Sequence, residues 1–212
     1  GEMLEYITRE VIQQAFLIEV RNIEQPLFGY KYFKQNHYFP ISWLRVYNSL
    51  HSLPPKDRLS PVRKRQINKA IQRGVTTQLV KTEEELEAFL KLLKRAYRSK
   101  ISKHFPDFNF FRLLMLQNHQ EETAQAFIVK YKDKIIGGSF CIYSGNNTYL
   151  WFSSSIKNTY SRLYPGVMAV WCALTDAYEK GYNHFCLYGC AGGRLDHTLA
   201  NMQTLSFIAS KN

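Results

Sequence analysis

The chain has 212 residues, of which 45% are hydrophobic, and its formal net charge is +11. This length suits one domain, or one domain with part of another, and the apolar fraction is enough for a core without metal or disulfide staples. There is no run of about 18 apolar residues and no signal peptide, so we expect a cytoplasmic protein without a transmembrane segment. Four irregularly spaced cysteines favour reduced thiols over a disulfide framework.

The first elements in the chain are two predicted extended segments and a helix. Residues Ala15–Arg21 (AFLIEVR) have the composition of a buried strand, and His37–Tyr47 forms a second extended stretch. Ser60 is a predicted N-cap with Pro61 in the first helical position, and Gly74 is expected to end that helix.

This helix carries one basic face. Arg65, Lys69 and Arg73 recur every four residues, and Ile67 and Ile71 lie on roughly the opposite face, which we expect to be the core side. Such a focused positive field attracts phosphates, although a merely solvated helix face is the other interpretation. The candidate anion-binding residues are Arg63, Lys64, Arg65, Lys69 and Arg73.

A short strand and two further helices follow. Thr76–Val80 is predicted as the strand, and Thr82 with Glu85 forms a capping-box pattern that starts a helix reaching Arg98. Asp107–Gln117 is the next predicted helix. The residues that keep helical spacing toward the core of the first of these helices are Leu86, Phe89, Leu90, Leu93, Ala96 and Tyr97.

The apolar pattern then changes to period two. Gln125–Tyr131, Ile135–Tyr143 and Asn147–Ser155 are predicted as three consecutive antiparallel strands, followed by a helix over Leu163–Gly181 and a strand over His184–Tyr188. The helix is expected to turn inward Val167, Val170, Trp171, Leu174, Ala177 and Tyr178. A right-handed crossover makes the last strand parallel to Asn147–Ser155, which gives an α/β fold with a mixed sheet of the α+β kind.

Several segments, in this order, resemble the Fem-type peptidoglycan aminoacyltransferases. Arg63–Ala70 closing at Gly74 is similar to the family's "RRxIRKAxxxGV" helix, and Glu19–Asn22 to its "EIRN" strand. Lys134–Gly138 resembles the hairpin that introduces the meander. Tyr160, Pro165 and the helix end Glu179–Tyr182 resemble the family's long helix, and Gly189–Gly192 stands where the family has a "GAG" segment.

The resemblance implies a fold related to the Gcn5-type N-acetyltransferases, the GNAT-like acyl-CoA N-acyltransferase fold. It also implies transfer of an amino acid from aminoacyl-tRNA to the peptide of a cell-wall lipid precursor. We expect residues 1–50 to be the remnant of a preceding acyltransferase-like domain, and residues 51–212 to be a GNAT-like domain with an atypical C-terminus. The chain departs from the family at Cys186, where Asp is usual, and over Arg194–Asn212.

The expected chemistry is the positioning of an activated acyl group against an amine, with hydrogen-bond donors for the oxyanion. Tyr160 and Tyr188 are the candidate catalytic residues, with a packing role as the alternative for each. We expect a substrate cleft where the predicted strands Asn147–Ser155 and His184–Tyr188 part. Its residues are Tyr149, Trp151, Ser153, Arg162, Gly189 and Gly192.

The donor is predicted from the turn before the long helix. Gcn5-type enzymes hold the coenzyme A pyrophosphate with a "QxxGxG" turn, whereas Tyr160–Gly166 has one glycine and Pro165, which lacks an amide N–H. This turn is expected to bind acetyl-CoA weakly, which favours aminoacyl-tRNA as the donor. The expected partner is tRNA or an anionic lipid-linked precursor. His184, Cys186, Cys190 and His197 match no zinc module, so no metal is expected.

Three functions therefore remain. The first is an acyl- or aminoacyltransferase acting in cell-wall peptide bridge formation. The second is a non-catalytic module of the same fold that binds tRNA, phosphate or an anionic membrane surface. The third is an acetyl-CoA-dependent N-acetyltransferase. Fold alone does not choose between them.

Overall fold

The computed structural model describes residues 1–15, 18, 20, 27–40, 45–50, 53–98, 105–116 and 123–188. The chain divides into two compact units, Gly1–Trp43 and Leu44–Asn212. The elements of each unit are described separately.

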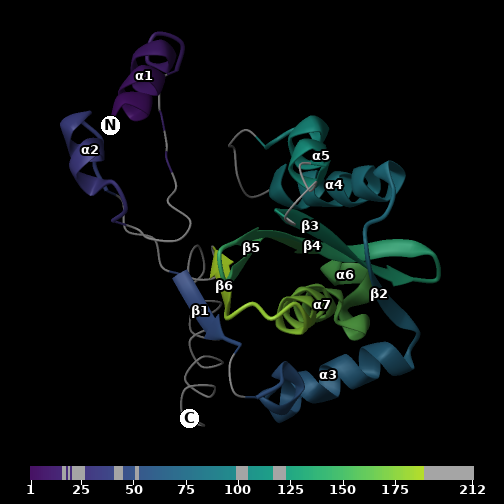
Figure 1. The fold of residues 1–212 in the computed structure, drawn as a ribbon. Coiled ribbons are helices and arrows are strands. Elements are labelled where there is room, and N and C mark those ends of the chain that lie inside the picture. The colour runs from purple at the N-terminus through teal and green to yellow at the C-terminus, as the bar shows by residue number, and fades with distance from the viewer. Residues whose placement is uncertain are drawn as a thin grey trace. The chain divides into compact units, whose positions relative to one another are not determined.

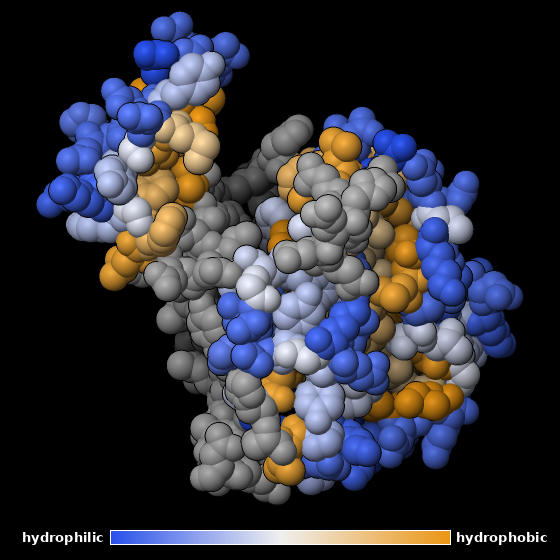
Figure 2. Space-filling model, viewed as in Figure 1, coloured by the Kyte–Doolittle hydropathy of each residue, from blue (hydrophilic) through white to orange (hydrophobic). Residues whose placement is uncertain are grey.

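The first unit contains two helices, α1 (Glu2–Val11) and α2 (Tyr30–Gln35). Apolar side chains gather on the surface of this unit (Figure 2). The most exposed are Met3, Ile12, Leu27, Phe28 and Phe39. The predicted strand Ala15–Arg21 lies largely outside the described residues, and the described Ala15, Ile18 and Val20 are not in a strand.

One six-stranded sheet forms the centre of the second unit (Figure 1). The strands are β1 (Arg45–Ser49), β2 (Val75–Leu79), β3 (Ala124–Tyr131), β4 (Lys134–Ser144), β5 (Asn147–Ser155) and β6 (His184–Tyr188). Their order is β1-β6-β5-β4-β3-β2, and only the β5–β6 pair is parallel. The α/β fold with a mixed sheet is therefore confirmed.

The predicted three-strand meander is confirmed as β3, β4 and β5. Lys132 and Asp133 both have positive φ, 47° and 63°, so they form a two-residue turn whose twist matches the right-handed twist of the flanking strands. The predicted strand over Thr76–Val80 is β2, displaced by one residue. Of the predicted extended stretch His37–Tyr47, residues 45–47 belong to β1, residues 41–44 lie outside the described residues, and His37 has a positive φ of 64° in a turn.

Helix α3 (Pro61–Gln72) begins and ends where the sequence predicted. The Ser60 hydroxyl accepts a hydrogen bond from the Arg63 amide at 3.3 Å, and Gly74 follows the helix with a φ of 82°. The predicted core face is half wrong. Ile67 is 5% exposed, but Ile71 is 55% exposed, and Ala70 takes its place in the core. At about 100° per residue, Ala70 lies about 60° to one side of Ile67 and Ile71 about 40° to the other, so the buried face is centred between Ile67 and Ala70 and leaves Ile71 outside it.

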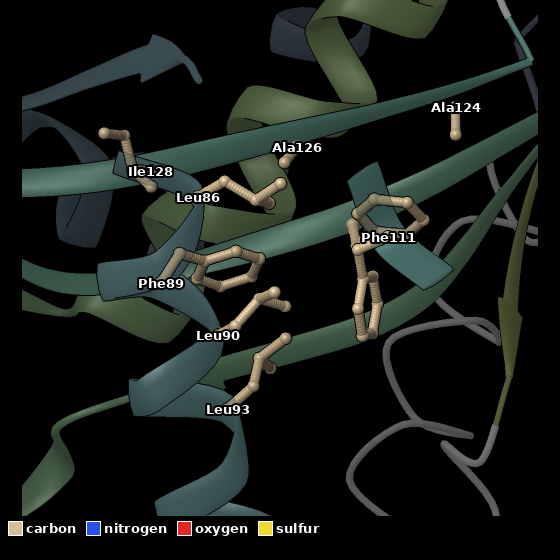
Figure 3. Packing of buried hydrophobic residues seen from close by; sticks show 9 residues of the cluster. Leu86, Phe89, Leu90, Leu93, Phe111, Ala124, Ala126 and Ile128 are labelled. Carbon is tan, nitrogen blue, oxygen red and sulfur yellow. The ribbon is translucent and has the colours of Figure 1, made fainter. Parts of the chain in front are cut away.

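Helices α4 (Glu83–Arg98) and α5 (Phe108–Leu116) cover one face of the sheet (Figure 1). The Thr82 hydroxyl accepts from the Glu85 amide at 3.3 Å, and an Asp107 carboxylate oxygen accepts from the Phe110 amide at 2.9 Å. Figure 3 shows Leu86, Phe89, Leu90 and Leu93 of α4 pointing at the strand residues. The apolar spacing predicted for α4 is thus the spacing that packs it on the sheet.

The opposite face is covered by α7 (Pro165–Glu179), with α3 beyond it (Figure 1). The predicted helix start at Leu163 is wrong, because α6 (Lys157–Tyr160) and the 3-10 turn η2 (Ser161–Leu163) precede α7. Of the predicted inward residues only Ala177 is fully buried; Val167, Val170, Trp171, Leu174 and Tyr178 are half-buried. The small residues Ala169, Ala173 and Ala177 form the contact line, since they let α7 lie close to the sheet.

Candidate functional site: the end of the parallel β5–β6 pair

The site lies at the parallel pair of the described strands. β5 and β6 pair from Asn147 with His184 to Leu150 with Leu187; β6 is described as far as Tyr188, and β5 continues to Ser155. We call Trp151–Ser155 the β5 extension. Parallel strands that part at one end leave backbone N–H and C=O groups directed away from the remaining neighbour, and such positions are common ligand sites in α/β sheets.

The backbone of the β5 extension has a defined orientation. The Ile156 amide donates to the Ile136 carbonyl of β4 at 2.9 Å. Because amides alternate along a strand, the Ser154 amide faces β4 as well, and the Ser153 amide faces away from β4, toward the side on which β6 pairs with the earlier part of the strand.

A β-bulge sets this orientation. Leu150 pairs with Cys141 and Phe152 pairs with Phe140, which leaves Trp151 as the extra residue of β5. A bulge bends its strand and increases the local twist, and this bulge directly follows Leu150, the last residue of β5 that pairs with the described part of β6.

Tyr97, from the last turn of α4, packs against the β5 extension, where its ring meets Phe152. Burial is the larger influence on the Tyr97 hydroxyl and raises its pKa, while the backbone of Ser153 acts in the opposite direction, toward a lower pKa. The group is therefore a neutral phenol, able to donate a proton in a hydrogen bond, across the physiological pH range.

Sequence reasoning placed Tyr97 in the core and did not single it out as a residue beside the site. Its helical spacing with Phe89 and Leu93 assigned it to the core face of α4, which is where its ring lies. The polar end of the ring had no signal in the sequence. The one clue is the residue type. A buried tyrosine carries a hydroxyl that needs a hydrogen-bond partner, whereas a purely apolar residue at the end of the same helical face would not.

Aromatic rings from α4, α5 and β5 pack around Tyr97. The Tyr97 ring meets Phe152 edge-on with centroids 5.8 Å apart and Phe105 at 5.6 Å. Trp151 stacks on Phe152 at 5.3 Å and meets Phe110 edge-on at 5.8 Å. These contacts hold Tyr97 against the β5 extension from the side of α4 and α5.

The far end of the β5 extension meets the N-terminus of α7. A Cβ on Gly166 would lie 3.1 Å from the Ser155 hydroxyl oxygen, so the first turn of α7 packs directly on the strand. Pro165 occupies the first helical position and Tyr164, which precedes it, has a φ of 51°. The amides of this first turn make a partly positive helix end, although Pro165 removes one donor.

Basic side chains continue from this helix end. The Arg73 guanidinium donates to the backbone carbonyl of Arg162 in η2 at 2.5 Å, which joins the C-terminus of α3 to the entrance of α7. Lys64, Arg65, Lys69, Arg73 and Arg162 are exposed, whereas Arg63 is half-buried and donates to Gln66 at 2.9 Å. The hydrogen bond thus links the basic helix α3 to η2, which directly precedes α7.

The other predicted site residues lie in several places. Trp151 and Ser153 belong to the β5 extension, and Tyr149 is buried in the paired part of β5, at 1% exposed. The Tyr160 ring packs edge-on against Tyr131 of β3 at 6.2 Å, two strands away from β5 in the sheet. The remaining predictions fall outside the description: Gly189 and Gly192 are not among the described residues, and neither is the side chain of Tyr188.

A separate groove lies between the edge strand β2 and α7. It is lined by Val75, Thr77, Leu79, Trp171, Cys172 and Asp176, among others. Burial raises the pKa of the Cys172 thiol to about 11, against the opposing hydrogen bond from Thr77, and burial raises the pKa of the Cys141 thiol well above its ordinary value. These thiols are protonated near neutral pH and so are poor nucleophiles. Across the described residues, no three His, Cys, Asp or Glu side chains gather as metal ligands would.

The β5 extension offers positioning chemistry. A backbone amide of this strand could donate a hydrogen bond to a carbonyl beside it, next to the aromatic rings of Trp151 and Phe152. Hydrogen bonds aimed at developing negative charge stabilise it. The described part of the chain contains no helix of the length and apolarity needed to cross a bilayer.

Comparison with known proteins agrees with this geometry. A family model described as an acetyltransferase (GNAT) domain matches residues 62–196. The fold is similar to that in a crystal structure of FemX, with a TM-score of 0.62 and 11% identity over 98% of this chain and 73% of that one.

It is also similar to the PaiA N-acetyltransferase from Thermoplasma acidophilum in complex with coenzyme A, with a TM-score of 0.50 and 13% identity over 61% of this chain and 88% of that one. No curated protein matches the sequence. Since the family model spans well over half of the chain, the chain belongs to the GNAT acetyltransferase-domain family, whose members are N-acyltransferases.

Proposed function

We propose that the protein transfers an aminoacyl group from aminoacyl-tRNA onto an amine of a cell-wall peptide. The observation that carries this choice of donor is the row of exposed basic residues on α3, whose last member, Arg73, is hydrogen-bonded to Arg162 in η2, directly before α7. A donor with many phosphates along its length fits such a surface better than one with phosphates at a single point.

The donor carbonyl would lie at the β5 extension, and its phosphate-bearing part would follow the basic surface past the first turn of α7. Pro165 supports this assignment, because the turn that would hold a pyrophosphate has one amide fewer. The cell-wall acceptor rests on the resemblance of Arg63–Ala70 and of the strand and helix segments after it to the Fem-type enzymes.

The chemical step needs no covalent enzyme intermediate. The amine nitrogen attacks the ester carbonyl carbon, a C–N bond forms, and the C–O bond to the tRNA ribose breaks. The amine gives up one proton and the leaving ribose oxygen gains one. Because the ester is already activated, the rate advantage comes from holding the two reactants in line and from stabilising the oxyanion.

The test is a transfer assay with the full chain. Aminoacyl-tRNA carrying a labelled amino acid and, in a parallel reaction, labelled acetyl-CoA are each offered to a lysine-containing muropeptide, and the products are identified by mass spectrometry. Aminoacylated peptide supports the proposal. Acetylated peptide alone would replace it with the acetyl-CoA-dependent activity. Tight tRNA binding without product from either donor would favour the non-catalytic module.

A further inference from the structure

Three segments that are far apart in the sequence meet at the end of β3. Tyr131, the last residue of β3, pairs with Val75, the first residue of β2. The Tyr131 ring meets the Tyr160 ring edge-on, with centroids 6.2 Å apart. The Arg73 guanidinium, just before β2, donates to the Arg162 carbonyl at 2.5 Å. We call Tyr131, Tyr160, Arg73 and Arg162 the aromatic–basic cluster, because strand pairing, ring packing and a hydrogen bond hold its two rings and two arginines together.

The two rings of the cluster have a buried side and an accessible side. Both tyrosines are half-buried and pack against the core residues Ile67, Val129 and Leu163, among others. The exposed Lys132 reaches the accessible side of Tyr131, where its Nζ lies 5.5 Å from the ring centroid. Because the core fixes the rings from behind, a flat ligand that stacks on them meets surfaces that are already in place.

The charge beside the rings suits a phosphate. Arg73 and Arg162 are both exposed. Among the residues that the structure describes, none is hydrogen-bonded to the Arg162 guanidinium, since the bond with Arg73 uses the Arg162 carbonyl. Aromatic faces for bases and positive charges for backbone phosphates are the two features that proteins combine to bind single-stranded nucleic acid.

We propose that the aromatic–basic cluster binds an unpaired nucleotide at the 3′ end of the RNA donor, with its base stacked on the Tyr160 ring and its phosphate against the Arg162 guanidinium. The inference rests on the proposed function, in which aminoacyl-tRNA is the donor, and adds the part of the RNA that is recognised. Nucleotides at the 3′ end of a tRNA are single-stranded and carry the amino acid, so their bases are available for stacking.

Coenzyme A also carries a base and phosphates, so the same stack could be made by its adenine. The row of exposed basic residues on α3 favours RNA, because it leads up to Arg73 and offers positive charge to more phosphates than one cofactor carries. The cluster also lies directly before Pro165, the first residue of α7, where the donor enters the site under the proposed function.

The experiment measures RNA binding by the full chain, so it does not depend on transfer activity. Fluorescein-labelled tRNA, and the same tRNA trimmed of its unpaired 3′ nucleotides, are each titrated with wild type, Tyr160→Leu and Tyr160→Phe. We expect Tyr160→Leu to bind the untrimmed tRNA about 5- to 150-fold more weakly, the range for the loss of one base–aromatic stack, and to bind the trimmed tRNA as wild type does. Tyr160→Phe keeps the stacking face and should bind both RNAs as wild type does.

The salt dependence of binding separates stacking from charge. Stacking releases no counterions, so Tyr160→Leu should keep the wild-type slope of log K against log salt. Arg162→Gln should flatten that slope by about 0.7 unit, the value for one single-strand phosphate. Tyr178→Leu, which replaces a half-buried tyrosine in the last turn of α7, is the matched control and should change neither affinity nor slope.

A loss for Tyr160→Leu that is confined to the untrimmed tRNA supports the site. An equal loss on both RNAs, a loss shared by Tyr160→Phe or Tyr178→Leu, or no loss at all overturns it. If circular dichroism shows that Tyr160→Leu does not fold, Arg162→Gln decides by the same comparison of the two RNAs.

Two further outcomes separate this site from the other source and from the proposed function. A calorimetric titration with coenzyme A, in which Tyr160→Leu weakens binding of coenzyme A while tRNA binding is unchanged, would assign the cluster to coenzyme A and overturn the RNA site. A wild type that binds the untrimmed tRNA through Tyr160 but transfers no aminoacyl group overturns the proposed function and leaves the site standing.

Discussion

Gly138 of β4 lies directly beneath the ring of Phe89 of α4. A Cβ on Gly138 would be 2.6 Å from Phe89 Cε2 and closer still to the Phe127 carbonyl oxygen. No real Cβ tolerates such approaches, so the absence of a side chain at Gly138 is what allows α4 to reach the sheet.

Gly138→Ala should therefore cost several kcal/mol of the free energy of unfolding, about 3 kcal/mol or more, since neither the Phe127 backbone nor the fully buried Phe89 can give way. Gly137→Ala is the matched control, because a Cβ there meets its nearest atoms at 3.2–3.3 Å and should cost less. Urea denaturation of both variants measures the difference, and equal losses would contradict the argument.

Glu85 and Lys130 join α4 to β3. The Glu85 carboxylate accepts from Lys130 Nζ at 2.7 Å, Gln78 Nε2 at 2.8 Å and the Lys81 amide at 3.0 Å. The hydrogen bond from Lys130 lowers the pKa of Glu85 below its ordinary value of 4.5, against the raising effect of burial. A lowered pKa in the folded state contributes stability that is present above pH 4.5 and is lost as the pH falls through the folded value.

We expect Glu85→Gln to lower the free energy of unfolding by about 1–2 kcal/mol at pH 7, and the gap to wild type to shrink below pH 4.5. Glu87→Gln on the same helix is the control. Its ion pair with Lys91 is exposed and should contribute less than about 0.5 kcal/mol. Denaturation curves at pH 3.5, 5 and 7 test this, and a gap that stays constant with pH would refute the ionic origin.

Cys172 should make the protein less stable at alkaline pH. Burial raises the pKa of its thiol from 9.0 to about 11, so between these values the unfolded chain releases a proton that the folded chain keeps. The stability contributed by this thiol is complete below pH 9.0 and is lost as the pH rises toward about 11.

Replacing Cys172 by Ala should thus cost most stability at pH 8, and the deficit should diminish at pH 10 to 11. The comparison uses the difference between variant and wild type at each pH, because other groups also titrate in this range. A deficit that is the same at pH 8 and pH 11 would exclude the thiol as the source.

The basic face of α3 can be tested for donor binding without unfolding the helix. Arg65→Gln with Lys69→Gln removes two exposed charges, while Ile67 and Ala70 keep the packing and Arg73 keeps its bond to Arg162. Affinity for tRNA should fall, and the slope of log K against log salt should flatten by roughly one unit per lost phosphate contact.

Lys132→Gln with Lys134→Gln, in the exposed β3–β4 turn, removes the same charge elsewhere and is the control. Fluorescence titrations at several salt concentrations give both affinity and slope. If the two double variants weaken binding equally, the effect belongs to net charge, and the face of α3 is only a solvated surface.

The segments predicted best from the sequence are those defined by local chemistry. Ser60 with Pro61 located the start of α3, Asp107 the start of α5, and the period-two pattern with its turns located β3, β4 and β5. Each of these signals acts within a few residues through a cap, a turn or a side-chain alternation, so a single stretch of chain contains all the information.

Helix faces were predicted less well, and the failures have a common cause. Ile71 is apolar but exposed, and on α7 the small Ala169, Ala173 and Ala177 are buried more deeply than Val170 or Trp171. Hydrophobicity marks which residues gain from burial, whereas the closeness of approach between a helix and a sheet decides which ones achieve it. That depends on the partner surface, which the helix sequence does not contain.

By itself, the sequence determined the order of the strands and of helices α3, α4, α5 and α7, the parallel β5–β6 pair and the basic face of α3, because each follows from local pattern or from the crossover rule. Only the tertiary structure decided that Trp151 is the bulged residue of β5 and that Tyr97 packs against Phe152 of that strand. The last contact joins residues more than fifty positions apart, and its geometry is fixed by the packing of α4 on the sheet. A contact of that kind is a property of the packed fold and has no trace in either local sequence.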